Sequence, residues 1–137
     1  KNLFKTSLGK YINPDVIEGK FSESGFIENI VVLGENQKYA GAIIVPDFAF
    51  LKTWCQKHEI KYTTPQEMIK NPDVKKRYAE EIKKINQNFG DTEKIKRYEL
   101  IADEWSVNNG ILTPTLKVKR SIVKEKYKDL IEMMYKD

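Results

Sequence analysis

The chain has 137 residues, enough for one domain, and its hydrophobic content of 40% is ordinary for a folded protein. Its 24 basic residues are interleaved with 20 acidic ones, and the absence of a cationic stripe argues against a nucleic-acid partner. One cysteine, Cys55, and one histidine, His58, exclude an internal disulfide and a metal site built from several such side chains. No apolar run reaches the ~20 residues of a membrane-spanning helix.

A short helix is the first clear element, after a short strand or loop over Asn2–Thr6. Asn13 is a suitable N-cap, Pro14 suits the first helical position, and the negative charge of Asp15 suits the helix dipole. Three apolar residues are expected to form the buried face: Val16, Ile17 and Phe21.

A β-hairpin is predicted next. Phe26–Leu33 and Ala40–Val45 are apolar and rich in β-branched residues, and the polar residues 34–37 between them predict a turn. The two runs should therefore pair antiparallel. Asp47 is then a suitable N-cap for a second helix. Its inward residues are expected to be Phe50, Leu51 and Trp54.

The middle of the chain predicts two more helices and a third strand. Thr64 and Asn71, each followed by a proline, are predicted to begin a short and a longer helix. The longer helix carries one apolar stripe, typical of a core-facing side: Val74, Tyr78, Ile82, Ile85 and Phe89. Alternating side chains over Lys96–Ala102 predict the strand.

An amphipathic helix capped by Ser121 is predicted to end the chain. Its inner face should consist of Ile122, Val123, Tyr127, Leu130, Ile131 and Met134. Taken in order, these elements predict an α+β domain in which helices pack on a small, mostly antiparallel sheet.

The segment Leu112–Arg120 carries the chemically most informative side chains. Pro114 restricts its backbone, and an extended conformation would point Lys117 and Lys119 to the same side. Since the segment is anchored between a turn and a helix, it can deliver an ammonium group to an anion. From charge alone, the alternative is a solvated basic loop.

A second suggestive segment, Lys5–Glu18, stands about a hundred residues earlier. It contains Ser7, Gly9 and Lys10, and the glycine on its own predicts a turn that needs a small residue. Lys10 on its own is typical of a surface ammonium group.

Together the two segments resemble the two signature segments of the C-terminal domain of adenylate-forming acyl-CoA synthetases. In that family a Pro/Thr-containing loop is followed by Ser-Gly-Lys, an apolar residue, any residue and Arg. Here Thr115-Leu116 replaces Ser-Gly, as is typical of long-chain fatty-acid–CoA ligases, which read Thr-Pro-Thr-Leu-Lys-x-Lys-Arg. Val118 and Arg120 fit the positions that follow the family's lysine. This register favours Lys117 as the catalytic residue and leaves Lys119 as its rival.

The resemblance implies separate tasks for the two segments. Lys117 would bridge the carboxylate and the α-phosphate of ATP while an acyl-adenylate forms. Ser7, Gly9 and Lys10 would form a CoA-side loop for the second half-reaction, with Gly9 flanking the pantetheine tunnel. Lys1 would lie near the hinge between domains.

The resemblance also implies that residues 1–137 are the mobile C-terminal lid of a longer polypeptide. A large N-terminal adenylation domain would bind ATP, the fatty acid and Mg²⁺, so the isolated chain should be inactive. The whole protein would convert a fatty acid, ATP and CoA to acyl-CoA, in the cytoplasm or at the membrane surface. The alternative is a non-catalytic basic binding module, or a scaffold, for a phosphate-bearing partner.

Overall fold

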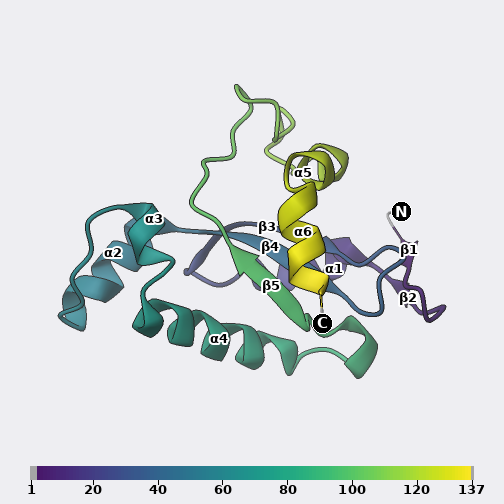
Figure 1. Cartoon of the computed structure of the whole chain (residues 1–137), viewed down its shortest axis with the longest axis horizontal. Helices are drawn as coiled ribbons and strands as arrows, with labels where there is room; N and C mark the ends of the chain where they lie inside the picture. The colour runs from purple at the N-terminus through teal and green to yellow at the C-terminus, as the bar shows by residue number, and fades with distance from the viewer. Residues whose placement is uncertain (1–2, 137) are drawn as a thin grey trace.

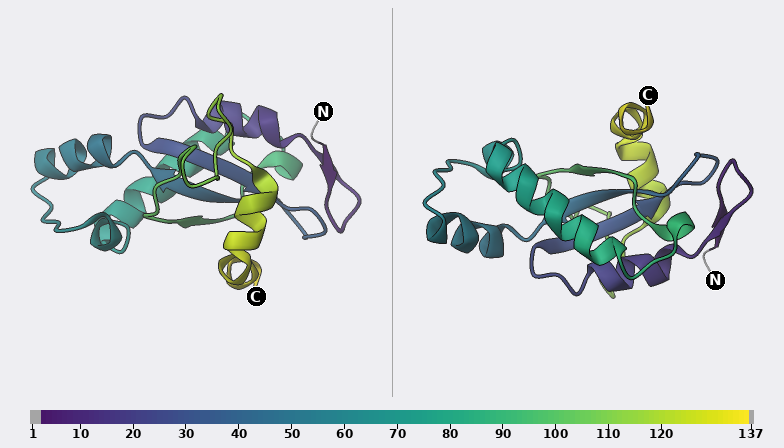
Figure 2. Two further views of the ribbon diagram at one scale, coloured as in Figure 1. Left: turned by 90° about the horizontal axis from the view of Figure 1, so that it is seen from above. Right: turned by 90° about the horizontal axis from the view of Figure 1, so that it is seen from below.

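The computed structural model describes residues 3–136 and arranges them in three layers around a small sheet (Figures 1 and 2). Lys1, predicted to lie near a hinge, is outside the described residues. The sheet has the strand order β3-β4-β5. β3 (Ile27–Leu33) pairs antiparallel with β4 (Gly41–Pro46), which confirms the predicted hairpin. β5 (Arg97–Leu100) pairs parallel to β4.

Both faces of the sheet are covered, which explains why β3 and β4 are almost continuously apolar. Alternate side chains of these strands enter two cores on opposite faces. The core on the side of α1 (Pro14–Phe21) and α4 (Pro72–Asn86) receives Ile30, Val32, Ala42 and Ile44. The core on the other side receives Val31, Leu33, Ile43 and Val45.

Four helices build the layer on one face. α1 (Pro14–Phe21) and α4 (Pro72–Asn86) pack on the sheet, and α2 (Phe48–Lys57) and α3 (Pro65–Met68) extend this layer at one end of the molecule (Figure 1). A short 3₁₀ helix, η1 (Asp91–Glu93), precedes β5. All four helices begin where predicted, because a side-chain oxygen of the capping residue accepts a first-turn N–H. The capping residues are Asn13, Asp47, Thr64 and Asn71. The predicted apolar stripe is confirmed in the core for Val74, Tyr78, Ile82 and Ile85. Its last member, Phe89, lies beyond α4, which ends at Asn86, and is only partly buried against this core.

The other face is covered by residues 101–119, α5 (Arg120–Lys126) and α6 (Lys128–Tyr135), which Figure 2 shows on the side opposite α4. The prediction of one helix capped by Ser121 is wrong. The helix begins at Arg120 without a side-chain cap, and Tyr127, with φ −108° and ψ 26°, divides it in two. The Tyr127 hydroxyl donates to Asp103 and accepts the Trp105 N–H, so contacts with distant residues hold the division in place.

Three residues predicted to face the core are exposed, by 61%, 45% and 41%: Val16, Phe50 and Ile122. In α1 the buried side is narrow, since Ile17 and Phe21 stand four residues apart and Val16 lies beside them. In the same way, Val123 and Tyr127 form the buried side of the helical segment that starts at α5, and Ile122 lies on its exposed side. Phe50 makes an edge-to-face contact with Phe26, with 4.8 Å between ring centroids, and its ring also lies against Gly25.

A separate two-stranded antiparallel sheet, β1 (Phe4–Lys5) with β2 (Tyr11–Ile12), projects at the end of the molecule opposite α2 and α3 (Figure 1). The predicted α+β class is confirmed, although the main sheet is mixed. Parallel neighbours need a long crossover, and residues 47–96 provide it between β4 and β5. No helix within residues 3–136 is long and apolar enough to cross a bilayer.

Candidate functional site

Residues 6–10, here called the Gly9 loop, form the predicted turn and join β1 to β2. The Thr6 N–H donates to the Lys10 carbonyl at 2.9 Å, and the Gly9 N–H donates to the Thr6 carbonyl at 3.0 Å. The Thr6 hydroxyl oxygen accepts the Lys10 N–H at 3.2 Å. Gly9 has φ 81°, and apart from Gly9 itself and its two neighbours in the chain no described residue places a heavy atom within 4 Å of the point that a Cβ would occupy. The backbone conformation therefore favours glycine, and the surface around it is open to a ligand.

Backbone hydrogen bonds tie the Gly9 loop to the turn between β3 and β4. The Ser7 N–H donates to the Gln37 carbonyl at 2.8 Å, and the Asn36 N–H donates to the Lys5 carbonyl at 3.1 Å. Ser7 and Lys10 are exposed. All three residues predicted for a CoA-side loop thus stand on one anchored turn at the surface.

Residues 113–117, here called the Lys117 loop, repeat this geometry. The Thr113 N–H donates to the Lys117 carbonyl at 2.8 Å, and the Leu116 N–H donates to the Thr113 carbonyl at 2.7 Å. The Thr113 hydroxyl oxygen accepts the Lys117 N–H at 3.1 Å. Leu116, with φ 68°, takes the place that Gly9 has in the other loop. The predicted extended conformation is therefore wrong for residues 113–116, which form a turn.

The chain on either side of this turn is held to the core. Leu112 and Val118 form an antiparallel bridge, and both pack in the core beneath α5. The Lys119 N–H donates to the Ile111 carbonyl at 2.8 Å, so residues 117–119 are extended as predicted. Lys117 and Lys119 are both exposed, but of the two it is Lys117 that lines a groove beside α1.

This groove lies between the Lys117 loop, α1 and β3. Its lining includes Glu18, Gly19, Asn29, Leu116, Lys117 and Arg120. Arg120 Nη1 donates to Glu18 Oε2 at 2.8 Å, and the same oxygen accepts the Val32 N–H at 2.8 Å. Arg120 Nη2 lies 3.7 Å from Asp15 Oδ1. The two informative segments, predicted separately, are thus joined by an ion pair across 102 residues.

Burial raises the pKa of the Glu18 carboxyl above its ordinary value of 4.5. The Val32 N–H and the Arg120 guanidinium oppose this rise, because both favour the charged form. Neither residue was predicted as a site residue, although Glu18 belongs to one informative segment and Arg120 ends the other. The opposite charges of Glu18 and Arg120 were the signal in the sequence from which their ion pair could have been predicted.

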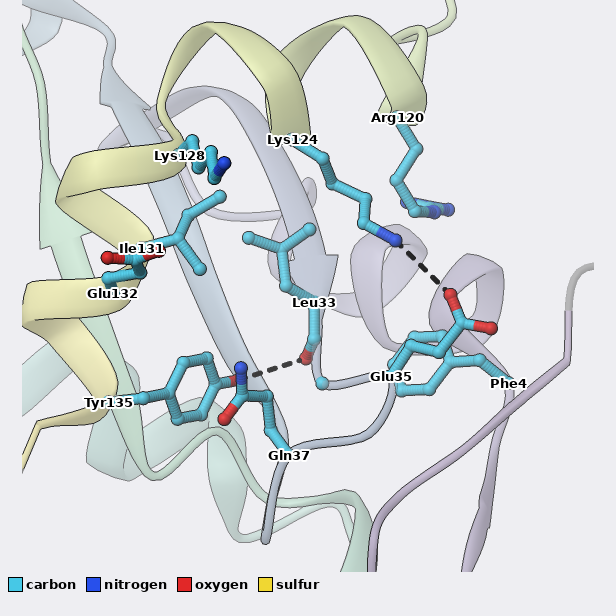
Figure 3. A pocket seen from close by; sticks show the side chains of 11 residues that line it. Phe4, Leu33, Glu35, Gln37, Arg120, Lys124, Lys128, Ile131, Glu132 and Tyr135 are labelled. Carbon is cyan, nitrogen blue, oxygen red and sulfur yellow. Dashed lines mark hydrogen bonds and ion pairs between the residues drawn. The ribbon is translucent and has the colours of Figure 1, made fainter.

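A second cavity, of about 230 Å³, lies between α5–α6 and the turn that follows β3 (Figure 3). Leu33 and Ile131 form part of its apolar wall. Lys124 Nζ lies 3.2 Å from Glu35 Oε1 at its rim, and Arg120 also lines it. Lys124 and Arg120 are both paired with carboxylates, and Lys128 is the third cation that lines this cavity. Lys117 remains the candidate for binding an anion, because its exposed ammonium stands on an anchored loop.

Residues 3–136 give little support for metal binding or for a reactive thiol or imidazole. Among residues 3–136, no three or more His, Cys, Asp and Glu side chains are grouped so that they could hold a metal ion. Cys55 is buried, and burial raises the pKa of its thiol, which disfavours the reactive thiolate. His58 stacks on Trp54, and its Nδ1 lies 2.9 Å from the Trp54 carbonyl oxygen. The candidate site therefore consists of the two lysine-bearing loops.

Curated proteins are similar in sequence to this chain over all or nearly all of its length. Human long-chain-fatty-acid–CoA ligase 6 is 35% identical over 138 residues, which cover 98% of this chain and 20% of that protein. The peroxisomal long chain acyl-CoA synthetase 6 of Arabidopsis thaliana is 30% identical over 140 residues, which cover 100% of this chain and 20% of that protein. The chain thus spans about a fifth of the length of the curated relatives it matches.

Solved structures share the fold. The adenylation domain of a carboxylate reductase from Mycobacterium chelonae matches with a TM-score of 0.79 and 20% identity, over 99% of this chain and 20% of that chain. The A-PCP didomain of carboxylic acid reductase from Segniliparus rugosus, in complex with AMP, matches with a TM-score of 0.74 and 24% identity, over 98% of this chain and 17% of that chain. The sequence model of one family, the AMP-binding enzyme C-terminal domain, matches residues 2–137 and so includes both loops. The chain belongs to this family of AMP-binding enzyme C-terminal domains.

Proposed function

We propose that this chain is the mobile C-terminal domain of a long-chain fatty-acid–CoA ligase. Such an enzyme joins a fatty acid to ATP, which forms an acyl-adenylate and releases pyrophosphate. It then transfers the acyl group to the thiol of CoA and releases AMP. The observation that carries the proposal is the exposed ammonium of Lys117 on an anchored loop, and the resemblance assigns this residue to the family's catalytic lysine. Identities of 35% and 30% to a long-chain ligase and a long-chain synthetase support the substrate class.

In the first half-reaction, Lys117 would act on the charge that develops as the carboxylate attacks the α-phosphorus of ATP. The lysine ammonium is compact and has three N–H donors, so it can bridge a carboxylate oxygen and a phosphate oxygen. The hydrogen bonds of Thr113 and the bridge between Leu112 and Val118 hold its backbone in place. A preorganised contact of this kind typically contributes a factor of ~10²–10³ in rate.

In the second half-reaction, the Gly9 loop would border the path of the pantetheine arm. The absence of a Cβ at Gly9, with open space around it, allows a thin ligand to approach the backbone. Ser7 and Lys10 stand on the same turn, where they would contact polar groups and phosphates of CoA. The β1–β2 hairpin lies at one end of the molecule, whereas the segment with Lys117 lies over the main sheet (Figure 2). The chain would therefore turn about a hinge near Lys1 between the two steps.

The proposal requires a partner, the N-terminal adenylation domain of the same polypeptide. That domain would supply the pockets for ATP and the fatty acid and would also bind Mg²⁺. The isolated chain should then form no acyl-CoA. We place the complete protein in the cytoplasm or at the membrane surface.

The test is ATP–pyrophosphate exchange by the complete polypeptide with carboxylic acids of graded chain length. Exchange that is strongest with long-chain acids, and that is lost in Lys117→Ala, supports the proposal. Lys119→Ala is the matched control, because it removes an exposed ammonium two residues away. Exchange lost in Lys119→Ala but kept in Lys117→Ala would move the catalytic assignment to Lys119. No exchange with any acid would favour the alternative, a non-catalytic basic module or scaffold.

A further inference from the structure

Leu116 has a backbone conformation that the proposed chemistry leaves unexplained. Its φ of 68° lies in the left-handed region, where a side chain crowds its own backbone. Among residues 3–136, the other non-glycine residues with positive φ are Asn36 and Glu59. Asparagine tolerates this region, and Glu59 follows the end of α2, where helices commonly place such a residue. Neither reason applies to Leu116.

The Gly9 loop shows how the same turn forms without this strain. Gly9 occupies the corresponding position with φ 81° and makes the corresponding hydrogen bond to a threonine carbonyl. A glycine at position 116 would therefore close the Lys117 loop equally well. The leucine side chain is not needed for the turn.

Packing within the chain does not explain Leu116 either. The residue is 65% exposed, and it lines the same groove as Lys117. Backbone strain that persists beside a candidate catalytic group often has a functional reason. An exposed apolar side chain held in this conformation beside Lys117 is therefore a candidate for contact with a bound substrate.

We propose that Leu116 contacts the fatty acid in the adenylation step, by packing against the first methylene groups next to its carboxylate. This inference rests on the proposed function. When the Lys117 ammonium bonds to the carboxylate, the adjoining atoms of a fatty acid are methylene groups. Residue 116 is the covalent neighbour of Lys117, with ~3.8 Å between Cα atoms. Its side chain would also displace water from around the ammonium and strengthen the interaction of that ammonium with both anionic groups.

Three variants separate backbone strain from substrate contact. Leu116→Gly removes both, Leu116→Asn reduces the strain and makes the side chain polar, and Leu116→Met keeps the strain and the apolar volume. The thermal midpoint of the 137-residue chain should rise by about 3 °C with glycine, rise less with asparagine and stay constant with methionine. In the complete polypeptide, glycine and asparagine should lower kcat/KM for the fatty acid in adenylation about tenfold, as expected for one lost apolar contact.

A rise in the thermal midpoint combined with a loss of adenylation supports the inference, because a merely structural role would move both in the same direction. Methionine should retain adenylation to within about threefold, and transfer from supplied acyl-adenylate to CoA should not change in any variant. Adenylation by the glycine and asparagine variants within about twofold of the parent would overturn the inference. Equal losses in all three variants would also overturn it. Failure of the proposed function is distinguishable, since the parent polypeptide itself would then form no acyl-adenylate.

Discussion

The Gly9 loop and the Lys117 loop are closed by the same hydrogen bonds, although their sequences, Thr-Ser-Leu-Gly-Lys and Thr-Pro-Thr-Leu-Lys, share only the first and last residue. In each loop the threonine backbone closes the turn, and its hydroxyl oxygen accepts the N–H of the lysine. The residue before the lysine is left-handed in both, but it is Gly9 in one loop and Leu116 in the other. This leucine costs about 1 kcal/mol relative to an unstrained residue.

The two loops are anchored in similar ways, each through flanking residues that pack in a core. Phe4 and Ile12, which pair on either side of the Gly9 loop, belong to the core on the side of α1 and α4. Leu112 and Val118, which pair on either side of the Lys117 loop, pack in the core on the other face of the sheet. The Lys117 loop has in addition the ion pair of Arg120 with Glu18 beside it. A strained residue persists where its surroundings over-determine the backbone, and this extra anchor fits the strain at Leu116.

The largest expected effect distinguishes Lys117 from Lys10, the lysine of the Gly9 loop. In the complete enzyme, Lys117→Ala should slow adenylation by ~10²-fold or more, about 3 kcal/mol, because it removes a contact to charge that develops in the transition state. Transfer from supplied acyl-adenylate to CoA should change little. Lys10→Ala, the matched change in the other loop, should spare adenylation. Single-turnover measurements of each half-reaction test this, and similar losses of adenylation in both variants would contradict the separation of tasks.

The second-largest effect is expected at Glu18, which anchors the Lys117 loop through its ion pair with Arg120. Glu18→Ala removes the acceptor of the Val32 N–H and the closest partner of Arg120. The free energy of unfolding should fall by about 2 kcal/mol, as expected when a buried donor is left unpaired. Glu18→Gln keeps an oxygen for the Val32 N–H and should stay within about 1 kcal/mol of the parent. Urea denaturation measures both, and equal destabilisation by alanine and glutamine would show that the charge is the essential part of the anchor.

Gly9→Leu makes the two loops alike at their left-handed position. The added side chain should obstruct the thiol's path and slow thioester formation at least tenfold, about 1.4 kcal/mol, while acyl-adenylate formation largely survives. Gly9→Asn is the control for backbone strain, because asparagine tolerates positive φ and is smaller than leucine. The two half-reactions are again measured separately. An equal loss of both steps in a folded Gly9→Leu variant would refute the assignment of this loop to CoA.

The smallest expected effect is a pH dependence that arises at the anchor of the Lys117 loop. Because the pKa of Glu18 is raised in the folded state, the folded chain binds a proton at a higher pH than the unfolded chain. The stability contributed by this carboxyl is therefore present at low pH and is lost as pH rises through the folded-state pKa. Between pH 7 and the ordinary value of 4.5, acidification should stabilise the parent relative to Glu18→Gln. A relative loss of stability on acidification would contradict this sign.

Helix starts were predictable because their chemistry is local. Asn13, Asp47, Thr64 and Asn71 each accept a backbone N–H two or three residues further along the chain, so the responsible residues adjoin in the sequence. The pairing of β3 with β4 was predictable for a similar reason, since a short polar turn joins two apolar runs.

The turn at Leu116 and the division at Tyr127 were not predictable in this way. Leucine carries no preference for the left-handed conformation, and the turn at Leu116 depends on core packing on both of its sides. The helical pattern continues through Tyr127, and the division there coincides with hydrogen bonds to Asp103 and Trp105, which stand 24 and 22 residues away. The parallel pairing of β5 likewise depends on the crossover through residues 47–96.

By itself the sequence determined the α+β class, the helix starts, the β3–β4 hairpin and the two lysine-bearing segments, because these depend on residues within one turn or hairpin of each other. Only the tertiary structure decided that both lysines close the same kind of turn, that Glu18 and Arg120 join the two segments, and that Lys117 rather than Lys119 lines the groove beside α1. These last features arise from how the two cores pack on opposite faces of the sheet, which brings together residues that sequence spacing leaves unrelated.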